Sequence, residues 1–314
     1  MDTFLITGGA GFIGSNIADR LLEQGHAVRV IDTFLTGKRE NLAQAQRSSR
    51  FELIEADIRN LESVRKACEG VDFVLHEAAI PSVPRSIDDP IASNETNING
   101  TLNVLKAASE RKVKRVVYAA SSSAYGDTAV LPKQEDMIPS PLSPYAVTKL
   151  TGEYYCRVFT GVYGLETVSL RYFNIFGPRQ DPASTYAAVI PRFITAIMKG
   201  ESPVVYGDGE QSRDFTYIEN VIQANIKACY APAAASGRVM NIACGTRYTL
   251  NEVIEMLEKI FKKKANQQYL PPKRGDVKHS QADIANAQRY IGYAIVTGFE
   301  EGLRKTVDYF ASLA

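Results

Sequence analysis

Short apolar runs alternate with amphipathic stretches along the first half of the chain. The runs are continuous and rich in β-branched residues, which is typical of strands that are buried on both faces. They cover residues 4–6, 27–31, 51–54, 71–75 and 115–118. Between them, apolar residues at helical spacing predict a helix that ends at Gly25 and a buried helix over 102–108. This alternation predicts an α/β fold with a doubly wound parallel sheet.

The pattern changes after about residue 170, where prolines and glycines become frequent and loops separate the remaining elements. Helical spacing over 187–199 and 249–264 predicts two helices, and 299–312 suits a short closing helix. We expect a smaller, irregular α+β C-terminal domain that is built over the carboxyl edge of the sheet.

Residues 237–243 suit one more strand that returns to the sheet. The domains are then discontinuous in sequence. We expect residues 1–170, with 213–246 returning to them, to form the larger domain, and residues 171–212 and 247–314 to form the smaller one.

Composition narrows the classes of function. The 314 residues carry 36 basic and 35 acidic side chains, whereas proteins that bind nucleic acid usually have a marked basic excess. No apolar run reaches the roughly 18 residues of a membrane span, and the first residues lack the pattern of a secretory signal. The cysteines, Cys68, Cys156, Cys229 and Cys244, have no metal-ligand spacing. We therefore expect a cytoplasmic protein with reduced thiols and no metal site.

Between the first predicted strand and the first predicted helix lies a glycine-rich segment, Thr7-Gly8-Gly9-Ala10-Gly11-Phe12-Ile13-Gly14. Glycines there allow a tight turn and let a pyrophosphate approach the backbone, while the helix N-terminus offers free N–H groups. Asp32 ends the next predicted strand, about 20 residues on, where a carboxylate accepts hydrogen bonds from ribose hydroxyls and repels a 2′-phosphate. The combination predicts a Rossmann-type dinucleotide site and favours NAD over NADP, a preference that Lys38 and Arg39 weaken. The alternative is an ordinary glycine turn with a capping aspartate.

Asp57 and Ile58 follow another predicted strand. Asp57 can either contact the adenine of a dinucleotide or cap a helix that begins near Leu61. The sequence leaves both roles open.

Tyr145 and Lys149 are four residues apart, which on a helix places a phenol and an ammonium on one face. A nearby cation favours the phenolate, so Lys149 can lower the pKa of Tyr145 and make it a general acid/base for interconverting an alcohol and a ketone. This spacing alone usually marks a solvated helix face. The serines at 121–123 favour a catalytic role because they follow a predicted strand, at an edge where open α/β sheets bind ligands. A serine hydroxyl there can bond the reacting oxygen and share its proton with Tyr145.

In this order along the chain, these motifs resemble the extended short-chain dehydrogenase/reductase superfamily and, within it, the nucleotide-sugar 4-epimerases. The resemblance covers nearly the whole chain. It is carried by residues 7–14, Asp32, Asp57-Ile58, 76–79, Thr96-Asn97, Gly100-Thr101, 121–126, 145–149, 171–174, Gly177-Pro178, Arg213-Asp214 and Gly275-Asp276. It implies NAD as cofactor, a UDP-sugar as substrate, an NAD-binding larger domain and a nucleotide-sugar domain. It also implies a homodimer that pairs through the helix after Thr96 and the helix carrying Lys149.

The resemblance assigns roles position by position. It implies Ser121, Tyr145 and Lys149 as catalytic residues. The residues that it implies around NAD are Gly8, Gly11, Phe12, Ile13, Gly14, Asp32, Thr36, Gly37, Asp57, Ile58, Ala78, Ala79, Thr96 and Phe173, together with Tyr145 and Lys149. The residues that it implies around the nucleotide sugar are Ser82, Arg85, Ser122, Ser123, Asn174, Val189, Val205, Tyr206, Arg213, Lys273, Arg274, Asp276 and Ser280.

Two positions depart from the family pattern. Pro81 replaces a lysine that is typical of UDP-glucose epimerases, and Lys273 replaces a diphosphate-binding arginine, for which Arg274 can substitute. Arg213 suits a diphosphate on physical grounds as well, because a guanidinium binds phosphate oxygens in pairs. Its alternative is a surface ion pair with Asp214.

The reaction can be narrowed from two positions. By the resemblance, dehydratases carry an Asp-Glu pair directly after the catalytic residue and decarboxylases keep a Glu two residues after it, whereas this chain has Ser122 and Ser123. Neither serine can act as a carboxyl acid or base, so dehydration is rejected and decarboxylation disfavoured. What remains is oxidation at C4, with Tyr145 taking the hydroxyl proton, turnover of the 4-keto sugar and return of hydride to its other face. NAD is regenerated in each cycle and is expected to stay bound.

Ser280 bears on the substrate. By the resemblance this position faces the C2 substituent of the sugar, and enzymes restricted to glucose and galactose carry a bulky tyrosine there. A small serine leaves room for an N-acetyl group, so we expect UDP-GlcNAc and UDP-GalNAc to interconvert, with UDP-glucose and UDP-galactose as further candidates. The alternatives are a polar loop residue without such a role, a UDP-glucuronate 4-epimerase that uses Arg85, a dehydrogenase that releases NADH, and a non-catalytic NAD-sensing regulator.

Overall fold

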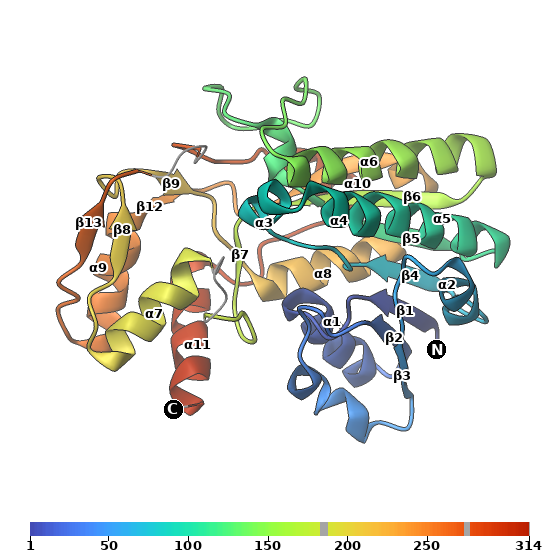
Figure 1. Ribbon diagram of the computed structural model, residues 1–314, viewed down its shortest axis with the longest axis horizontal. Coiled ribbons are helices and arrows are strands. Elements are labelled where there is room, and N and C mark those ends of the chain that lie inside the picture. The colour runs from blue at the N-terminus through green and yellow to red at the C-terminus, as the bar shows by residue number, and fades with distance from the viewer. Residues whose placement is uncertain (183–187, 273–276, 314) are drawn as a thin grey trace.

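A seven-stranded parallel sheet forms the centre of the computed structural model, which describes residues 1–182, 188–272 and 277–313 (Figure 1). The strand order is β11-β6-β5-β4-β1-β2-β3, which confirms the expected α/β, doubly wound parallel sheet. The strands are β1 (Thr3–Thr7), β2 (Ala27–Asp32), β3 (Phe51–Glu55), β4 (Phe73–His76), β5 (Arg115–Ser121), β6 (Glu166–Tyr172) and β11 (Arg238–Ile242). The order reverses between β1 and β4, where sheets of this kind form a crevice for ligands.

The hydrophobic pattern misses β6, because half of its side chains are polar. Thr167, Ser169 and Arg171 alternate with apolar residues and are all buried. Thr167 Oγ1 donates to the carbonyl of Cys156 at 2.9 Å, and Arg171 donates to both carboxylate oxygens of Glu153 at 2.8 and 2.7 Å. The strand is therefore buried on both faces without an apolar run.

Helices cover both faces of the sheet (Figure 1). On one face lie α2 (Leu61–Ala67), α5 (Gly100–Glu110) and α6 (Pro144–Tyr163). On the other lie α1 (Phe12–Glu23), α8 (Ile218–Cys229) and α10 (Ala285–Ile291). Each face buries its own apolar cluster, because successive strand residues point to opposite sides: Leu5 belongs to the first cluster, and Phe4 and Ile6 to the second.

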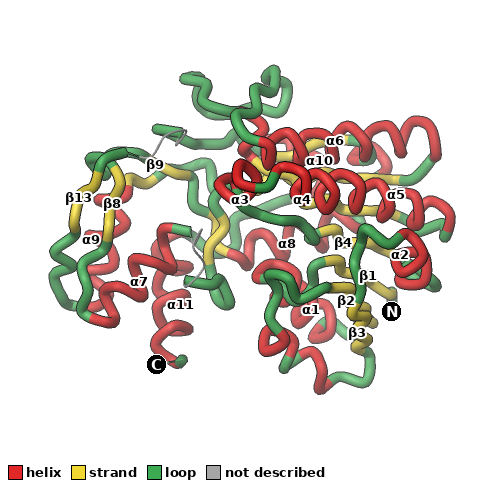
Figure 2. Tube along the Cα trace, in the orientation of Figure 1, coloured by secondary structure: helices red, strands yellow, loops and turns green. Residues whose placement is uncertain are grey.

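A second part of the molecule lies beyond the carboxyl edge of the sheet and contains more loop than the first (Figure 2). Its helices are α7 (Val189–Lys199), α9 (Leu250–Phe261) and α11 (Phe299–Ser312). Its strands are β7 (Ile175–Phe176), β8 (Val204–Tyr206), β9 (Ser212–Arg213), β10 (Thr216–Tyr217), β12 (Tyr248–Thr249) and β13 (Gln268–Leu270). They form three two-stranded sheets, β10-β7, β12-β9 and β13-β8. Strands of two or three residues are too short to give a periodic pattern in the sequence.

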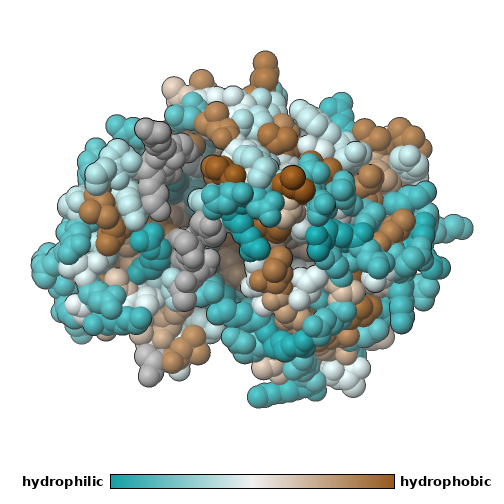
Figure 3. Space-filling model, viewed as in Figure 1, coloured by the Kyte–Doolittle hydropathy of each residue, from teal (hydrophilic) through white to brown (hydrophobic). Residues whose placement is uncertain are grey.

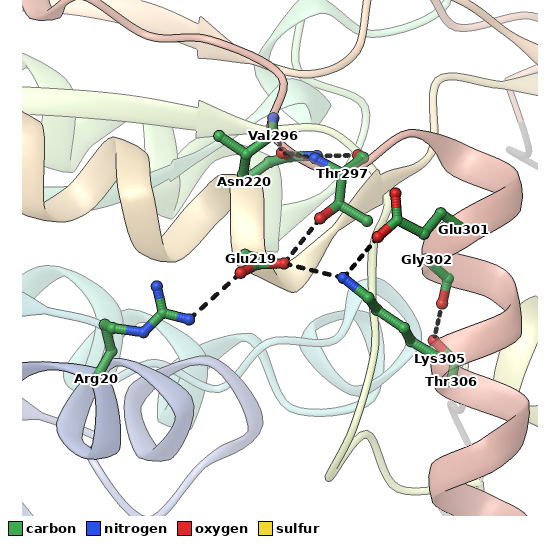
Figure 4. Close-up of polar contacts among 9 residues, drawn as sticks. All are labelled: Arg20, Glu219, Asn220, Val296, Thr297, Glu301, Gly302, Lys305 and Thr306. Atoms are coloured by element: carbon green, nitrogen blue, oxygen red, sulfur yellow. Dashed lines mark hydrogen bonds and ion pairs between the residues drawn. The ribbon is translucent and has the colours of Figure 1, made fainter. Parts of the chain in front are cut away.

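A network of polar contacts joins the two parts (Figure 4). Glu219, in the first turn of α8, is 3.3 Å from Nη2 of Arg20 on α1 and 3.4 Å from Nζ of Lys305 on α11. The hydroxyl of Thr297 donates to Glu219 at 2.7 Å. Next to it, Oδ1 of Asn220 accepts the N–H groups of Val296 and Thr297 at 2.8 and 3.1 Å, so that α8 holds the segment before α11.

The face of the molecule shown in Figure 3 is mostly hydrophilic, with scattered apolar side chains, and is hollowed near its centre. Among the described residues, no helix combines the length and the apolar character needed to span a membrane. The described part of the chain also lacks any cluster of three His, Cys, Asp or Glu side chains suited to a metal ion.

Candidate active site

The glycine turn brings the backbone after β1 against the backbone after β4. Gly8 has a φ of +69°, and a Cβ at this position would lie 2.7 Å from the N and Cα atoms of Ala78. At Gly14, a Cβ would lie 2.6 Å from the carbonyl oxygen of Gly8. Residues with side chains would therefore push α1 away from the sheet. The Ala78 N–H donates to Thr7 Oγ1 at 3.2 Å, which fixes Ala78 and Ala79 beside the turn.

Asp32 lies at the end of β2 and points toward the same turn. Its Oδ2 accepts the N–H of Ala10 at 2.9 Å, and its Oδ1 accepts the N–H of Phe34 at 2.8 Å. Burial raises the pKa of Asp32, and these backbone N–H groups oppose the shift. The segment with Thr36 and Gly37 is close by, since a Cβ on Gly37 would lie 3.0 Å from Asp32 Oδ2.

The two basic residues next to this segment are both paired with acids. Lys38 lies 3.4 Å from Asp181, and Arg39 lies 2.5 Å from Glu55. Their charges are thus partly neutralised within the protein.

Asp57 is not the cap of α2. Asn60 takes that place, because its Oδ1 accepts the N–H of Ser63 at 3.0 Å. The Asp57 carboxylate instead accepts from the guanidinium of Arg59 at 2.7 and 2.9 Å, and it stays partly exposed. The Ile58 side chain is buried in the cluster under α5.

Thr96 lies in a π-helical turn, η3 (Glu95–Asn99), and is partly buried. The neighbouring Asn97 is buried and was not assigned a role from the sequence. Its Oδ1 accepts the N–H of Ile80 at 2.8 Å, and its Nδ2 donates to Thr148 Oγ1 at 3.1 Å. Asn97 thereby ties the loop after β4 to α6. The Thr96-Asn97 pair within the family motif was the available signal.

Ser121 and Tyr145 come from elements that converge at the carboxyl edge. Ser121 is the last residue of β5, and its Oγ accepts the hydroxyl of Ser123 at 2.9 Å. Tyr145 is in the first turn of α6, which Ser143 caps by accepting the N–H of Ala146 at 3.2 Å. Ser121 is close enough to Tyr145 to lower the pKa of the phenol, against the effect of burial. The arrangement can pass a proton between a substrate oxygen and the phenol.

Lys149 lies one turn further along α6 and is buried. Its Nζ donates to the carbonyl of Ala119 at 2.7 Å and lies 5.1 Å from the centre of the Tyr118 ring. Burial lowers the pKa of Lys149. Burial also raises the pKa of Tyr145, and Ser121 opposes that shift. The lowered Tyr145 pKa that the spacing predicts is therefore not found in this arrangement, in which Lys149 is directed to Ala119.

A cavity of about 520 Å³ opens beside these groups. Of the predicted residues, those in its wall are Phe12, Ile13, Ser121, Ser122, Ser123, Tyr145, Phe173, Asn174, Arg213 and Ser280. Wall residues that were not assigned from the sequence include Tyr125, Lys133 and Gln180. Lys133 is buried and its ammonium donates to the carbonyl and hydroxyl of Thr128. No spacing signal marks it, because the loop that carries it is irregular.

The far side of the cavity depends on Asp214. This buried carboxylate accepts the N–H groups of Cys244, Gly245 and Ala282 at 2.8, 3.0 and 3.1 Å. Burial raises its pKa, and the three N–H groups oppose the shift. The expected alternative of an Arg213–Asp214 surface ion pair is therefore wrong.

Arg213 and Ser280 are held by the same strand pairing. Arg213 Nη1 donates to the carbonyls of Ser212 and Lys278 at 3.0 and 3.1 Å. The N–H of Ser280 donates to the carbonyl of Ser212 at 3.0 Å. Both side chains line the cavity. Asp214 holds this backbone in place, because its carboxylate binds the N–H of Ala282, two residues after Ser280.

Several predicted substrate residues lie outside the cavity wall, as far as the described residues define it. Ser82 caps α3 (Val83–Asp88) by accepting the N–H of Arg85 at 3.2 Å, although Pro81 and Val83 on either side of it line the wall. Val205, in the middle of β8, is buried, and Val189 and Tyr206 are partly buried. Lys273, Arg274 and Asp276 lie outside the described residues.

The glycine turn and α1 fit a dinucleotide. Gly11 precedes α1 and no side chain caps the helix, so the first N–H groups of α1 have no intrahelical or side-chain partner. The turn has no room for a Cβ but exposes these donors, which is the arrangement that binds a pyrophosphate. Asp32, at the end of the next strand, suits a ribose hydroxyl.

Comparison with known proteins matches this geometry. Residues 4–243 match the NAD dependent epimerase/dehydratase family. The UDP-glucose 4-epimerase of Mycolicibacterium smegmatis is 34% identical over 98% of this chain and 97% of its own length. The structure of UDP-N-acetylglucosamine 4-epimerase from Methanobrevibacter ruminantium, in complex with UDP-N-acetylmuramic acid, is 40% identical, covers 100% of this chain and 99% of its own, and has a TM-score of 0.95. The structure of UDP-glucuronic acid 4-epimerase from Bacillus cereus, with UDP-glucuronic acid and NAD, is 35% identical, covers 99% and 100%, and has a TM-score of 0.93.

Proposed function

The chain belongs to the NAD dependent epimerase/dehydratase family and is a UDP-sugar 4-epimerase that uses NAD, and from this premise we propose that it interconverts UDP-GlcNAc and UDP-GalNAc. The observation that carries the proposal is Ser280 in the cavity wall, where a small hydroxyl leaves room beside the sugar. The similar UDP-N-acetylglucosamine 4-epimerase, at 40% identity, supports it. UDP-glucose and UDP-galactose fit the same space and are expected as further substrates.

We assign proton transfer to Tyr145 and Ser121. Tyr145 takes the proton of the C4 hydroxyl and returns it after the 4-keto sugar has turned over, while Ser121 hydrogen-bonds the reacting oxygen. Lys149 holds the cofactor ribose from the buried side of α6. When bound, NAD supplies the acceptor for the C4 hydride and gives the hydride back to the opposite face.

The remaining residues bind and orient. We assign residues 1–170 with 213–246 to NAD, and residues 171–212 with 247–314 to the nucleotide sugar. Two exceptions are Arg213, which we assign to the nucleotide sugar, and α10, which packs on the sheet. Arg213 holds the diphosphate, because a guanidinium in the wall is suited to phosphate oxygens. The anchored nucleotide lets the 4-keto sugar present either face while it stays enclosed.

The test is incubation of the purified protein with UDP-GlcNAc, without added NAD, followed by separation of the sugar products. UDP-GalNAc at equilibrium is expected. Ser280→Tyr is expected to lower kcat/KM for the N-acetyl substrates by roughly 100-fold or more while sparing UDP-glucose, because the ring fills the space beside C2. Ser280→Ala is the matched control and keeps both activities. An equal loss on both sugar types in Ser280→Tyr would refute the role of this position.

A second candidate substrate is UDP-glucuronate. It is favoured by Lys133, a buried cation in the cavity wall, and by the similarity to a UDP-glucuronic acid 4-epimerase. Arg85, the cation expected from the sequence, lies on α3 and is a weaker partner for a C6 carboxylate. Conversion of UDP-glucuronate, with no conversion of UDP-GlcNAc, would select this candidate.

We also infer a cytoplasmic homodimer. The outer face of α6 exposes Val147, Tyr154, Val158 and Val162, which recur at helical spacing, and Ile91 beside it is 71% exposed. Such a stripe suits pairing with a second copy of the chain. The four cysteines are free and buried, which agrees with a reducing compartment. The mass of the purified protein in solution tests the dimer.

A further inference from the structure

Glu77 is a carboxyl group beside the active site that lies within the 76–79 motif and was assigned no role from the sequence. It is the first residue after β4, and its N–H donates to the carbonyl of Thr7 at 3.1 Å. It also lies against the glycine turn, because a Cβ on Gly8 would come within 3.1 Å of its carbonyl carbon. Within residues 1–182, 188–272 and 277–313, no basic side chain forms an ion pair with it.

A chain of hydrogen bonds fixes the Glu77 carboxylate. Asn225 Nδ2 donates to the Tyr172 hydroxyl at 2.7 Å and to the carbonyl of Val221 at 2.9 Å. The Tyr172 hydroxyl donates in turn to Glu77 Oε1 at 2.8 Å. Because the amide supplies a donor to the phenol oxygen, the phenol proton is directed at Glu77. Asn225 on α8 thus holds the Glu77 carboxylate in one position through Tyr172 on β6.

Glu77 lies close to the carbonyl of Ala119, which accepts a hydrogen bond from Lys149. The register of β4 and β5 pairs His76 with Tyr118, so the next residue on each strand, Glu77 and Ala119, are level as well. Lys149 Nζ donates to the Ala119 carbonyl at 2.7 Å. The Tyr172 hydrogen bond carries the Glu77 carboxylate from β4 to the end of β6, and Lys149 Nζ bonds Ala119 on β5, the strand between them. Both charges therefore lie at the carboxyl end of β5.

The charge of Glu77 acts on both reacting groups of α6. Burial lowers the pKa of Lys149, and the Glu77 carboxylate opposes this. Burial raises the pKa of Tyr145, and the Glu77 carboxylate raises it further. Burial also raises the pKa of Glu77 itself, against the Tyr172 hydrogen bond and the charge of Lys149. Each of the two charges thus opposes the shift that burial imposes on the pKa of the other.

The other titratable groups around this pair are fixed in one form. Burial lowers the pKa of His76 to about 3, so its ring is neutral between Thr7 and Thr101. Glu153 is bound to Arg171 in a buried ion pair. Burial raises the pKa of the Cys156 and Cys229 thiols and of the Tyr118 and Tyr172 phenols.

We propose that Glu77 is a positioning residue for the epimerase reaction: its carboxylate keeps the Lys149 ammonium charged and opposes the phenolate form of Tyr145. The inference rests on the proposed roles of Tyr145 and Lys149. Removal of the carboxylate favours loss of a proton from both groups, since an anion attracts the ammonium and repels the phenolate. Both limbs of the pH profile of kcat then move in the same direction.

The experiment compares Glu77→Gln with the wild-type protein. Gln can still accept from Tyr172 but has no charge. Both limbs of the kcat profile are expected about one pH unit lower, the size expected for one nearby charge. Glu77→Asp keeps the charge and is expected to keep both limbs near their wild-type positions, even where the shorter side chain lowers the rate. Glu52→Gln, an exposed carboxyl on β3, is the control.

A second measurement needs no turnover. The near-ultraviolet absorbance of the Tyr145 phenolate is titrated as the difference between each protein and the same protein carrying Tyr145→Phe. Glu77→Gln is expected to form the phenolate about one pH unit lower than the wild-type. An unchanged titration, or a kcat that falls equally at every pH, would overturn the role of Glu77. Failure of the proposed function would instead appear as a wild-type protein that converts no UDP-sugar while this titration shift persists.

Discussion

The glycine turn, which is the proposed cofactor side of the site, is built of backbone. The turn after β1 touches the chain after β4 so closely that a Cβ on Gly8 would lie 2.7 Å from two backbone atoms of Ala78. On the proposed substrate side, the wall is made of side chains on irregular segments, which are held by hydrogen bonds to one buried carboxylate, Asp214. The first side tolerates almost no change in shape. The second can exchange single side chains, such as Ser280, without losing its backbone.

This difference suits a constant cofactor on one side and a variable sugar on the other. A backbone cradle recognises a dinucleotide through features that every NAD molecule has. Side chains on loops recognise the sugar, which differs from one UDP-sugar to another. The following variants test the comparison, from the largest expected effect to the smallest.

Tyr145→Phe removes the reacting phenol and leaves both walls intact. We expect kcat to fall by roughly 10²–10⁴-fold, the usual contribution of a positioned general acid/base. Phenylalanine keeps the buried ring, so the melting temperature should change little. Turnover of UDP-GlcNAc and thermal unfolding are measured together. A variant within tenfold of the wild-type rate would exclude Tyr145 as the acid/base.

Gly8→Ala places a Cβ in the close contact between the glycine turn and Ala78. The residue combines a φ of +69° with a Cβ clash, so we expect the free energy of unfolding to fall by about 3 kcal/mol or more and bound NAD to be lost. Gly25→Ala is the matched control: its φ is +88°, but a Cβ there meets nothing within 4 Å, and a cost of only about 1–2 kcal/mol follows. Denaturant unfolding measures the change in stability, and the absorbance of retained NAD measures cofactor binding. Equal costs would mean that the close approach to Ala78 is unimportant.

Asp214→Asn weakens the hydrogen bonds that hold the substrate side of the cavity. An amide offers one acceptor oxygen, so its NH₂ group faces at least one of the three backbone N–H groups that the carboxylate now binds. We expect a loss of about 1–3 kcal/mol in the free energy of unfolding and a raised KM for the UDP-sugar, with NAD retained. Loss of NAD in this variant would show that the two walls are not independent.

Arg20→Ala removes one link of the network between the two parts (Figure 4). The Arg20 and Glu219 side chains are 38% and 30% exposed, and such ion pairs contribute little. We expect the free energy of unfolding to change by less than about 1 kcal/mol and kcat/KM to stay unchanged. A larger loss would mean that the parts are held by this charge network and not by Asp214, Asn220 and apolar packing.

The fold of the sheet and the class of cofactor could be predicted from the sequence because their signals are local. The glycine turn, the apolar strands and the pair Tyr145–Lys149 each follow from spacing over a few residues. The pKa of Tyr145 is raised instead of lowered, because burial and the charge of Glu77 act on the phenol while Lys149 is directed to Ala119. That outcome depends on contacts across three strands, which no spacing encodes.

The substrate side was harder to derive for the same reason. Asp214 meets Cys244 and Ala282 only in the folded chain, and Lys133 reaches the cavity from a loop without a periodic pattern. β6 escaped detection because its polar side chains are satisfied by partners such as Glu153 on α6. In each case a long-range hydrogen bond replaces the apolar burial that sequence patterns report.

The strand order also means that β6 is synthesised well before β11, the strand that pairs with it. β6 has emerged once Tyr172 is made, but its neighbour β11 begins only at Arg238, so the growing chain carries an open sheet edge in between. At about 5–20 residues per second this interval lasts roughly 3 to 13 seconds. An open edge is a template for pairing with other nascent chains, and inward-pointing polar or charged residues weaken it. The buried polar residues Thr167, Ser169 and Arg171 thus weaken the pairing of β6 with other chains until β11 has been synthesised.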